Sequence, residues 1–321
     1  MENILITSAG KRVTLVKQFQ NELKSVYPYS KVLTTEMNPK MSPAALVSDG
    51  CFQVLSVTSK GYIEELLDIC IKNEVKVIIP TIDTELLVLS LHKKMFLEHG
   101  IQPIVSDFLF IETCRDKRNT EIFLIQNDIH VPKAIDKNNP TFPLFAKPYD
   151  GSLSKDLFVL KSIEELTPTI LNNPKLIFME YIDKVEYKEF TVDMYYGKDN
   201  FVKGIVPRER VEIRAGEINK GFTRKNYLVD FLKKRLEYIP GVIGCICIQV
   251  FYKEIDNDVV GIEINPRFGG GYPLSYSAKA NFPANIIKEY IIGEEVLYSD
   301  SWLNNTLMLR YDSEVIVYDK I

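Results

Sequence analysis

Three oxygen-bearing side chains in the C-terminal third of the sequence are spaced so that they could bind a divalent cation. Residues 259–265 alternate in character and are rich in β-branched residues, which predicts a strand with Glu263 and Asn265 on one face. An acidic turn at residues 256–258 would join this strand to the preceding one as a hairpin and set Gln249 opposite Asn265. Carboxylate and amide oxygens, without a thiol or an imidazole, are typical of Mg²⁺ sites that also use substrate phosphates.

Arg267 follows at the end of this strand, where it can reach the same phosphates, and three glycines come shortly after it. The pattern Gln249…Glu263-x-Asn265-x-Arg267 resembles the metal-binding hairpin of ATP-grasp enzymes, most closely the synthetase halves of the carbamoyl-phosphate synthase large subunit. The resemblance implies that the first three residues hold two Mg²⁺ (or Mn²⁺) ions against the phosphates of ATP. It implies a catalytic role for Arg267 in stabilising charge. Taken alone, these residues also fit an ordinary hairpin with an Asn-Pro turn.

Two lysines upstream extend the resemblance. Residues 142–148 predict an apolar strand that carries Lys147 into dry surroundings, where an unpaired ammonium is costly and a phosphate partner would offset the cost. Lys117 lies in a predicted helix at residues 116–127. The resemblance implies that both lysines bind ATP phosphates, although a solvated helix lysine is the alternative for Lys117.

The segment 150–156 occupies the place of the glycine-rich flap that covers the phosphates in this family. Ser152 and Ser154 are its expected nucleotide-binding residues, since such flaps bring backbone N–H groups close to phosphate. Gly151 is its only glycine. This departure from the family pattern affects flap closure more than ATP binding.

An apolar strand is predicted at residues 176–182, and in the family this strand is the hinge between two lobes that clasp ATP. The resemblance implies that the backbones of Glu180 and Ile182 contact the adenine beside Tyr181. Glu189, in the sequence Glu-Phe-Thr-Val-Asp, matches the acid that binds the ribose hydroxyls. The alternative for each glutamate is a surface charge on a strand.

Arg208, Arg210 and Arg214 are evenly spaced and would share one face of a strand. Arginine presents a planar fork that suits carboxylate and phosphate. The run lies between the predicted ribose site and the metal hairpin, so we predict that one or two of the three hold an acceptor carboxylate or acyl phosphate. Solvated charge is the usual explanation of such a run.

The N-terminal third alternates strands and helices, which predicts a parallel sheet covered on both faces. The first strand-to-helix turn, residues 8–12, could hold an anion, and Glu36 lies where a dinucleotide fold would have its ribose-binding acid. The turn has one glycine where a dinucleotide fingerprint needs three, so a Rossmann-type NAD-dependent dehydrogenase is only an alternative. We expect Thr81 or Asp83 to cap the helix that follows the fourth strand. The alternative is that Asp83 and Glu85 lie at the carboxyl end of the sheet, in the crevice where ligands bind. Strands are expected at 4–7, 31–35, 51–55, 75–80 and 101–105, and helices at 13–23, 62–72 and 85–98.

Composition limits the remaining classes of function. The chain has 321 residues, 46% of them hydrophobic, and a net charge of −4, so nothing favours nucleic acid or an anionic membrane. No apolar run is long enough to span a membrane. Five cysteines and three histidines form no zinc or disulfide pattern, which indicates a reducing cytoplasm.

We therefore predict an α/β and α+β chain: a Rossmann-like preATP-grasp domain at 1–113, then a two-lobed ATP-grasp fold with lobes at 114–183 and 184–321. The implied activity is that of an ATP- and Mg²⁺-dependent ligase that activates a small carboxylate as an acyl phosphate for attack by an amine. The chain is a possible homodimer. A non-catalytic ATP-binding module with a decayed flap is the main alternative. In the last lobe we expect a helix at 222–238, another beginning at 286, and closing strands at 307–311 and 315–317.

Overall fold

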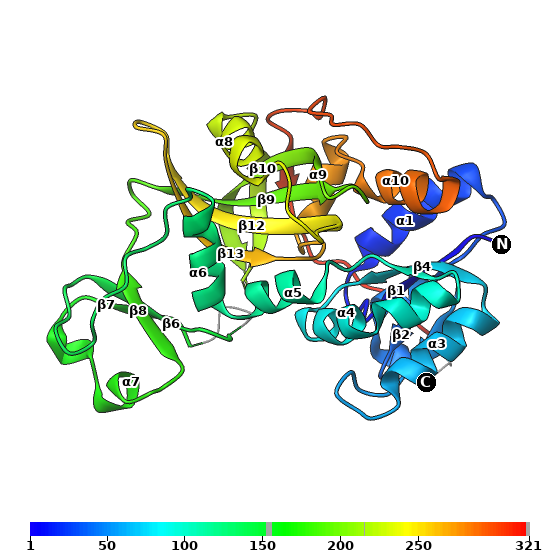
Figure 1. Ribbon diagram of the computed structural model, residues 1–321, viewed down its shortest axis with the longest axis horizontal. Coiled ribbons are helices and arrows are strands. Elements are labelled where there is room, and N and C mark those ends of the chain that lie inside the picture. Colours follow the sequence, from blue (N-terminus) through cyan, green and yellow to red (C-terminus); the bar gives the residue numbers. More distant parts are fainter. Residues whose placement is uncertain (152–155, 215, 319–321) are drawn as a thin grey trace.

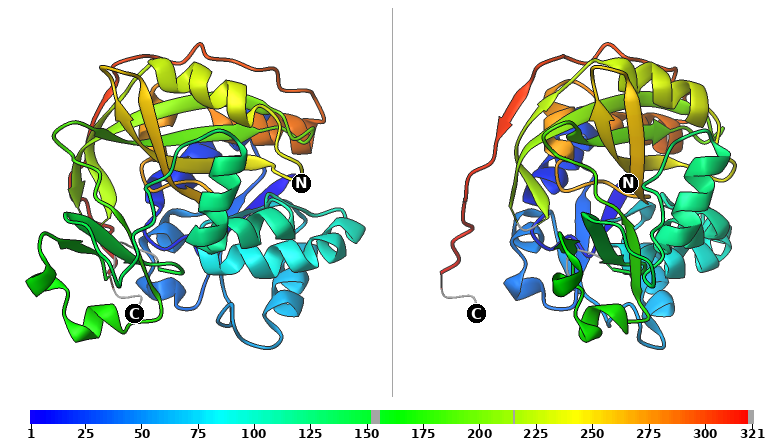
Figure 2. Two further views of the ribbon diagram at one scale, coloured as in Figure 1. Left: turned by 60° about the vertical axis from the view of Figure 1, so that its left-hand side comes forward. Right: turned by 90° about the vertical axis from the view of Figure 1, so that its left-hand side faces the viewer.

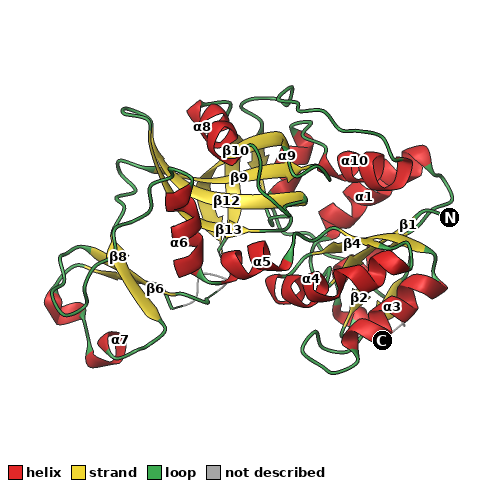
Figure 3. Cartoon of the chain, in the orientation of Figure 1, coloured by secondary structure: helices red, strands yellow, loops and turns green. Residues whose placement is uncertain are grey.

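The computed structural model describes residues 1–151, 156–214 and 216–318, which form three successive β-sheets (Figures 1 and 3). The first is parallel and has the order β3-β2-β1-β4-β5. Its strands are β1 (Asn3–Thr7), β2 (Val32–Glu36), β3 (Cys51–Gln53), β4 (Val75–Pro80) and β5 (Gln102–Pro103).

Helices cover both faces of this sheet because its strands carry apolar side chains on both. Ile4 and Ile6 of β1 share a buried cluster with Phe19 of α1, while Leu5 belongs to a second cluster with Leu66 of α3. The predicted parallel sheet with two covered faces is confirmed. The helices and short turns of this region are α1 (Val13–Val26), η1 (Pro39–Met41), α2 (Pro43–Val47), α3 (Tyr62–Lys72) and α4 (Asp83–Glu98).

Two helices, α5 (Phe108–Arg115) and α6 (Lys117–Gln126), lead from this sheet to a small antiparallel sheet with the order β7-β6-β8. This small sheet projects from the rest of the molecule at the lower left of Figure 1. Its own core is limited to a few side chains such as Leu144 and Phe178. The elements are β6 (Leu144–Pro148), β7 (Phe158–Leu160), η2 (Ile163–Glu165), α7 (Pro168–Leu171) and β8 (Leu176–Glu180).

The third sheet is antiparallel, with the order β13-β12-β9-β10-β11-β14. It packs against the first sheet's α1, whose Phe19 ring contacts Phe268 edge-on at a centroid distance of 5.8 Å. Figure 2 shows the arrangement of the sheets and helices from two further directions. The elements are β9 (Lys188–Tyr196), β10 (Val202–Arg214), β11 (Glu217–Thr223), α8 (Tyr227–Leu236), β12 (Gly244–Lys253), β13 (Asp258–Asn265), α9 (Tyr272–Ser277), α10 (Phe282–Ile287), η3 (Lys288–Ile292) and β14 (Leu307–Leu309).

Three predictions for the last 100 residues are wrong in detail. The helix expected at 222–238 starts only at Tyr227, because residues 217–223 form β11 between β10 and β14. The helix expected from 286 begins earlier, at Phe282, where the Asn281 side chain accepts a hydrogen bond from the Ala284 N–H. Residues 315–317 are not a strand, since they pair with no neighbour among the described residues. In the part of the chain that is described, no helix has the length and apolar character needed to cross a bilayer.

Candidate functional site

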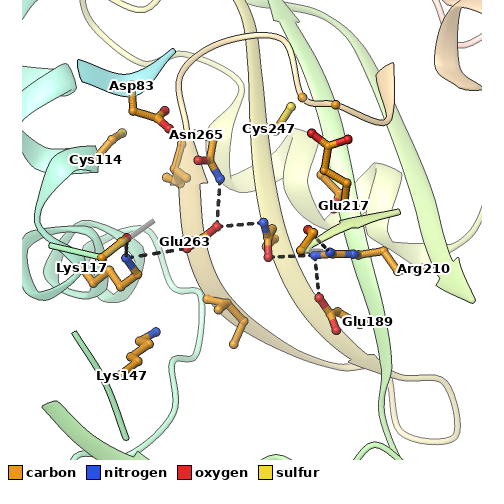
Figure 4. Close-up of a pocket in the computed structure, with 18 of the residues that line it drawn as sticks. Asp83, Cys114, Lys117, Lys147, Glu189, Arg210, Glu217, Cys247, Glu263 and Asn265 are labelled. Carbon is orange, nitrogen blue, oxygen red and sulfur yellow. Dashed lines mark hydrogen bonds and ion pairs between the residues drawn. The ribbon is translucent and has the colours of Figure 1, made fainter. Parts of the chain in front are cut away.

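A cavity of about 860 Å³ is lined by the small sheet and the third sheet, by α4, α5 and α6, and by the turn before α1. Figure 4 shows side chains from these elements pointing into it. Lys147 of the small sheet and Glu189 of the large sheet lie at one end, while Asp83 and Glu217 lie at the other. The cavity brings together most of the residues that the sequence singles out.

The metal hairpin forms as β12 and β13, but its register differs from the prediction. Gln249 pairs with Glu263 instead of Asn265, which pairs with Cys247. The tip of the hairpin is longer than three residues, and a β-bulge between Gln249 and Val250 shifts the register again. The bulge leaves the three oxygen-bearing side chains on the same face.

These three side chains converge on one carboxylate. Glu263 Oε1 accepts hydrogen bonds from Gln249 Nε2 at 2.8 Å and from Asn265 Nδ2 at 3.0 Å (Figure 4). The other Glu263 oxygen, Oε2, lies 4.0 Å from Lys117 Nζ. A half-buried carboxylate flanked by two amides is a hard oxygen donor set, which fits Mg²⁺ or Mn²⁺ once the amides turn their oxygens inward.

Another cluster of residues that could ligate a metal combines one acid with two thiols. Asp193, Cys245 and Cys247 are the only group of three His, Cys, Asp or Glu residues that the described chain brings within ligating distance. Asp193 is already bonded to Arg208 and accepts a hydrogen bond from Ser275, and burial raises the pKa of the Cys245 thiol. The Asp193 oxygens are therefore already bonded within the protein, and the hairpin remains the candidate metal site.

Arg267 is held by the N-terminal region. Its guanidinium donates two hydrogen bonds to Asp83 at the start of α4, Nε to Oδ1 at 2.8 Å and Nη2 to Oδ2 at 2.7 Å. Nη2 also lies 3.4 Å from Asn265 Oδ1, so Arg267 joins the hairpin to the first sheet. Burial alone would lower the pKa of Arg267, but the Asp83 carboxylate more than offsets this and raises it.

Neither Thr81 nor Asp83 caps α4, contrary to the prediction. Asp83 lines the cavity, as the alternative had it, whereas Glu85 is buried and bonded to Thr7 and Tyr62. The N-cap is Ile82, without a side-chain hydrogen bond to the helix. The Thr81 hydroxyl instead donates to the Thr7 and Ser8 carbonyls, and the Asp83 carboxylate faces Arg267.

The two predicted phosphate lysines lie near each other but differ in their contacts. Lys147 is only 3% exposed, and its ammonium has no hydrogen-bond or ion-pair partner in the described part of the chain. Burial lowers its pKa, partly offset by the charges of Glu263 and Glu121. Lys117 donates to the Gly151 carbonyl at 2.6 Å. Ser152 and Ser154 of the predicted flap lie outside the described residues.

The predicted adenine and ribose residues line the same end of the cavity. Glu180 is the last residue of β8, and Tyr181 and Ile182 follow it. The Glu180 side chain accepts a hydrogen bond from the Lys133 N–H at 3.0 Å. Glu189 on β9 pairs with Arg210 Nη1 at 2.7 Å. The sequence indicated this end of the cavity, but not the pairing of Glu189 with an arginine.

The prediction that three arginines share one face is wrong for Arg214. Register shifts in β10 between Arg210 and Ile213 interrupt the alternation of side chains, so that Ile213 lines the cavity, whereas Arg214 is 59% exposed and pairs with Asp312. Arg210 lines the cavity, bonded to Gln249 Oε1 at 3.1 Å and to the Gly216 carbonyl at 2.8 Å. Arg208 also lines the cavity, but it is 1% exposed and forms two bonds of 2.7 and 2.8 Å with Asp193.

The glycines after Arg267 have a packing role. A Cβ on Gly271 would lie 2.1 Å from Arg208 Nη1, and one on Gly270 would lie 2.6 Å from the Glu217 carboxyl carbon. The loop can therefore pass over two charged groups only where side chains are absent. Glu217 is a cavity residue that sequence reasoning missed, because its partner Arg310, at 2.5 Å, is distant in the sequence.

In the turn at residues 8–12, the backbone N–H that could bind an anion is already bonded to a carboxylate of the same chain. The Gly10 N–H donates to the Glu36 carboxylate, which also accepts from the Ser42 hydroxyl at 2.9 Å. A side-chain carboxylate thus takes the place that a dinucleotide pyrophosphate or ribose would need, which weakens the dehydrogenase alternative.

Comparison with known proteins agrees with this architecture. Residues 4–104 match the family model described as PylC-like, N-terminal domain. Residues 172–303 match the model described as ATP-grasp in the biosynthetic pathway with Ter operon. No curated protein matches the sequence.

Solved structures with similar folds cover nearly the whole chain. A biotin carboxylase–β,γ-ATP complex from Campylobacter jejuni has a TM-score of 0.71 at 14% identity, covering 95% of this chain and 74% of that one. The biotin carboxylase domain dimer of Hydrogenobacter thermophilus 2-oxoglutarate carboxylase, with MgADP, ADP and bicarbonate, has a TM-score of 0.69 at 12% identity and coverages of 95% and 73%. An L-amino acid ligase from Bacillus licheniformis has a TM-score of 0.65 at 16% identity, with coverages of 90% and 74%. These matches confirm the predicted fold class, a Rossmann-like domain followed by an ATP-grasp fold.

Proposed function

Because the chain is an ATP-grasp protein with a PylC-like N-terminal domain, we propose that it is an ATP- and Mg²⁺-dependent carboxylate–amine ligase. The carboxylate oxygen of an acid substrate attacks the γ-phosphorus of ATP, the bond to the β-phosphate oxygen breaks, and ADP leaves. An amine then attacks the carbonyl carbon of the acyl phosphate. The carbon–oxygen bond to phosphate breaks, inorganic phosphate leaves, and the amine nitrogen loses a proton.

The observation that carries this proposal is the convergence of Gln249 and Asn265 on Glu263, across the cavity from a buried lysine without a partner among the described residues. Bound at these oxygens, Mg²⁺ would neutralise charge on the β- and γ-phosphates. Lys147 and Lys117 would bind phosphate oxygens, and a phosphate would offset the cost of burying the Lys147 ammonium.

The remaining residues would position the substrates. The backbones of Glu180 and Ile182, with Tyr181 beside them, would hold the adenine. Glu189 would bind the ribose, oriented by Arg210. Arg267, fixed by Asp83, would face the carbonyl and phosphate oxygens where charge develops during transfer. Arg208 would act indirectly, as the buried support of the glycine loop.

We also propose that the chain resembles carbamoyl-phosphate synthase and that it forms a homodimer. Its three units are proposed to lie at 1–113, 114–183 and 184–321. The neighbour from Hydrogenobacter thermophilus is a dimer, which gives the homodimer a precedent within the fold.

A screen of ADP release tests the proposal. Wild-type protein with ATP and Mg²⁺ is presented with pairs of amino acids, sugar acids and amines, and Glu263→Gln serves as the matched control. ADP release that requires both an acid and an amine, and is lost in the variant, supports the ligase. Tight binding of ATP without ADP release for any pair would favour the non-catalytic module.

A further inference from the structure

Among the described residues, Arg12 is a cation without a carboxylate partner at the end of the cavity that holds Asp83 and Glu217, the acceptor end. It comes from the turn before α1 and lines the cavity beside Thr81 and Asp83. Its guanidinium has five N–H donors, yet its hydrogen bonds among the described residues are limited to one, from Nη2 to the Thr81 carbonyl at 3.3 Å. In residues 1–151, 156–214 and 216–318, no acid lies within ion-pair distance of it.

The two nearest acids are already neutralised. Asp83 accepts two hydrogen bonds from Arg267, and Glu217 pairs with Arg310 at 2.5 Å. The acids and arginines of these two pairs balance each other's charge, and Arg12 adds one positive charge to this end of the cavity. Burial lowers the pKa of Arg12, and the nearby charge of Arg267 lowers it further. A half-buried guanidinium next to another cation gains most from an external anion.

Arg12 is also separate from the end of the cavity that holds Lys147, the phosphate end. It donates to the Thr81 carbonyl, two residues before Asp83, and Asp83 lies at the opposite end of the cavity from Lys147 (Figure 4). The carboxylate to be activated must lie near Glu263 and Asn265, so Arg12 faces a part of the substrate beyond Arg267.

We infer that the substrates include a second anionic group, a carboxylate or a phosphate, which binds Arg12 and is distinct from the carboxylate that is activated. This inference rests on the proposed ligase function, since it assigns the activated carboxylate to the hairpin. The second anion belongs either to the acid, as in a dicarboxylate, or to the amine, as in an amino acid. In both cases Arg12 selects the anion-bearing partner.

The test is equilibrium binding, which is independent of turnover. By titration calorimetry, with MgADP present and absent, we would compare succinate with butyrate and alanine with ethylamine, and add inorganic phosphate as a small anion. The four proteins are wild type, Arg12→Gln, Arg12→Lys and Lys11→Gln. Lys11 is the matched control, because it is an exposed cation next in sequence that does not line the cavity.

We expect wild type to bind succinate or alanine at least about tenfold more tightly than the matched probe that lacks the additional carboxylate, as for a hydrogen bond to a charged group. Arg12→Gln should remove the preference, Arg12→Lys should keep part of it, and Lys11→Gln should keep all of it. Succinate or alanine as the preferred probe tells which substrate carries the anion. Equal binding within both matched pairs, or an unchanged preference in Arg12→Gln, overturns the inference. MgADP binding in the same titrations tests the nucleotide site separately.

Discussion

Asp83 and Glu217, at the acceptor end of the cavity, are each bonded to an arginine of the same chain, whereas Lys147 at the phosphate end is buried without an ion-pair partner among the described residues. The first arrangement fixes side chains in one geometry from opposite sides of the cavity. The second leaves a cation whose burial is costly until an anion binds.

The difference indicates that the two ends of the cavity have different roles. Paired charges suit groups that must keep a fixed position through a reaction, such as Arg267 between Asp83 and Asn265. An unpaired buried lysine suits a group whose partner arrives with the ligand. Stability and binding should therefore respond in opposite ways at the two ends, and the following variants test this from the largest expected effect to the smallest.

Glu263→Gln should have the largest effect on activity. It keeps an oxygen that can accept from Gln249 and Asn265 but removes the charge that a divalent cation needs. We expect ADP formation to fall by at least about a hundredfold, the upper range for groups that only support metal ligands. Steady-state ADP release measures this, and near-wild-type activity with an unchanged Mg²⁺ requirement would refute the metal assignment.

Lys147→Met should weaken ATP binding by about ten- to a hundredfold, because a charge-assisted hydrogen bond contributes ~1.5–3 kcal/mol. Lys117→Met is the matched control and should lose less, since Lys117 is more exposed and already donates to the Gly151 carbonyl. Nucleotide titration of both variants decides the order. A larger loss at Lys117 would reverse the ranking.

The same Lys147→Met variant should unfold at a higher temperature than wild type without nucleotide, because an apolar chain replaces a buried ammonium. The pKa of Lys147 is lowered by burial, so the unfolded chain binds more protons at alkaline pH and wild-type stability rises as pH increases through that lowered pKa. The variant should lack this rise. Thermal melts from neutral to alkaline pH measure it, and parallel curves for both proteins would contradict the prediction.

Asp83→Asn should lower kcat by about tenfold, ~1.4 kcal/mol, while leaving ATP affinity unchanged, since it loosens Arg267 without touching the phosphate end. A purely structural role would instead lower the melting temperature with little change in kcat per folded molecule. Measuring kcat, the KM for ATP and thermal unfolding on the same preparation separates these outcomes.

Arg210→Lys and Arg214→Lys form the pair with the smallest expected effects. The Arg210→Lys change would remove the planar guanidinium that contacts both Glu189 and Gln249, so we expect a several-fold rise in the KM for ATP. Arg214 is exposed and lies away from the cavity, so its variant should stay within about 0.5 kcal/mol of wild type in stability and in every kinetic constant. Impaired turnover at Arg214 would show that β10 changes register when substrates bind.

The parts of the site that could be predicted depend on local patterns. Alternation along 259–265 placed Glu263 and Asn265 on one face, and an apolar run around Lys147 indicated its burial. Both inferences need only neighbouring residues, so tertiary packing did not change them. The parallel sheet at the N-terminus was predictable for the same reason.

The parts that could not be predicted depend on contacts between distant segments. The bonds from Asp83 to Arg267 and from Glu217 to Arg310 join residues 184 and 93 positions apart, and no spacing rule indicates them. Register shifts between Arg210 and Ile213 of β10 change which side chains face the cavity, as Arg214 illustrates. Such shifts arise from sheet packing. Spacing rules assume a regular strand, so they do not indicate where a bulge will occur.

The most direct test of the central claim is titration of ATP into wild type and Glu263→Gln, each with and without Mg²⁺, with NADH as a comparison ligand. We predict that Mg²⁺ tightens ATP binding to wild type by at least about tenfold, has little effect on the variant, and that NADH does not bind. Equal Mg²⁺ dependence in both proteins, or NADH binding in preference to ATP, would contradict a metal-assisted nucleotide site at the β12–β13 hairpin.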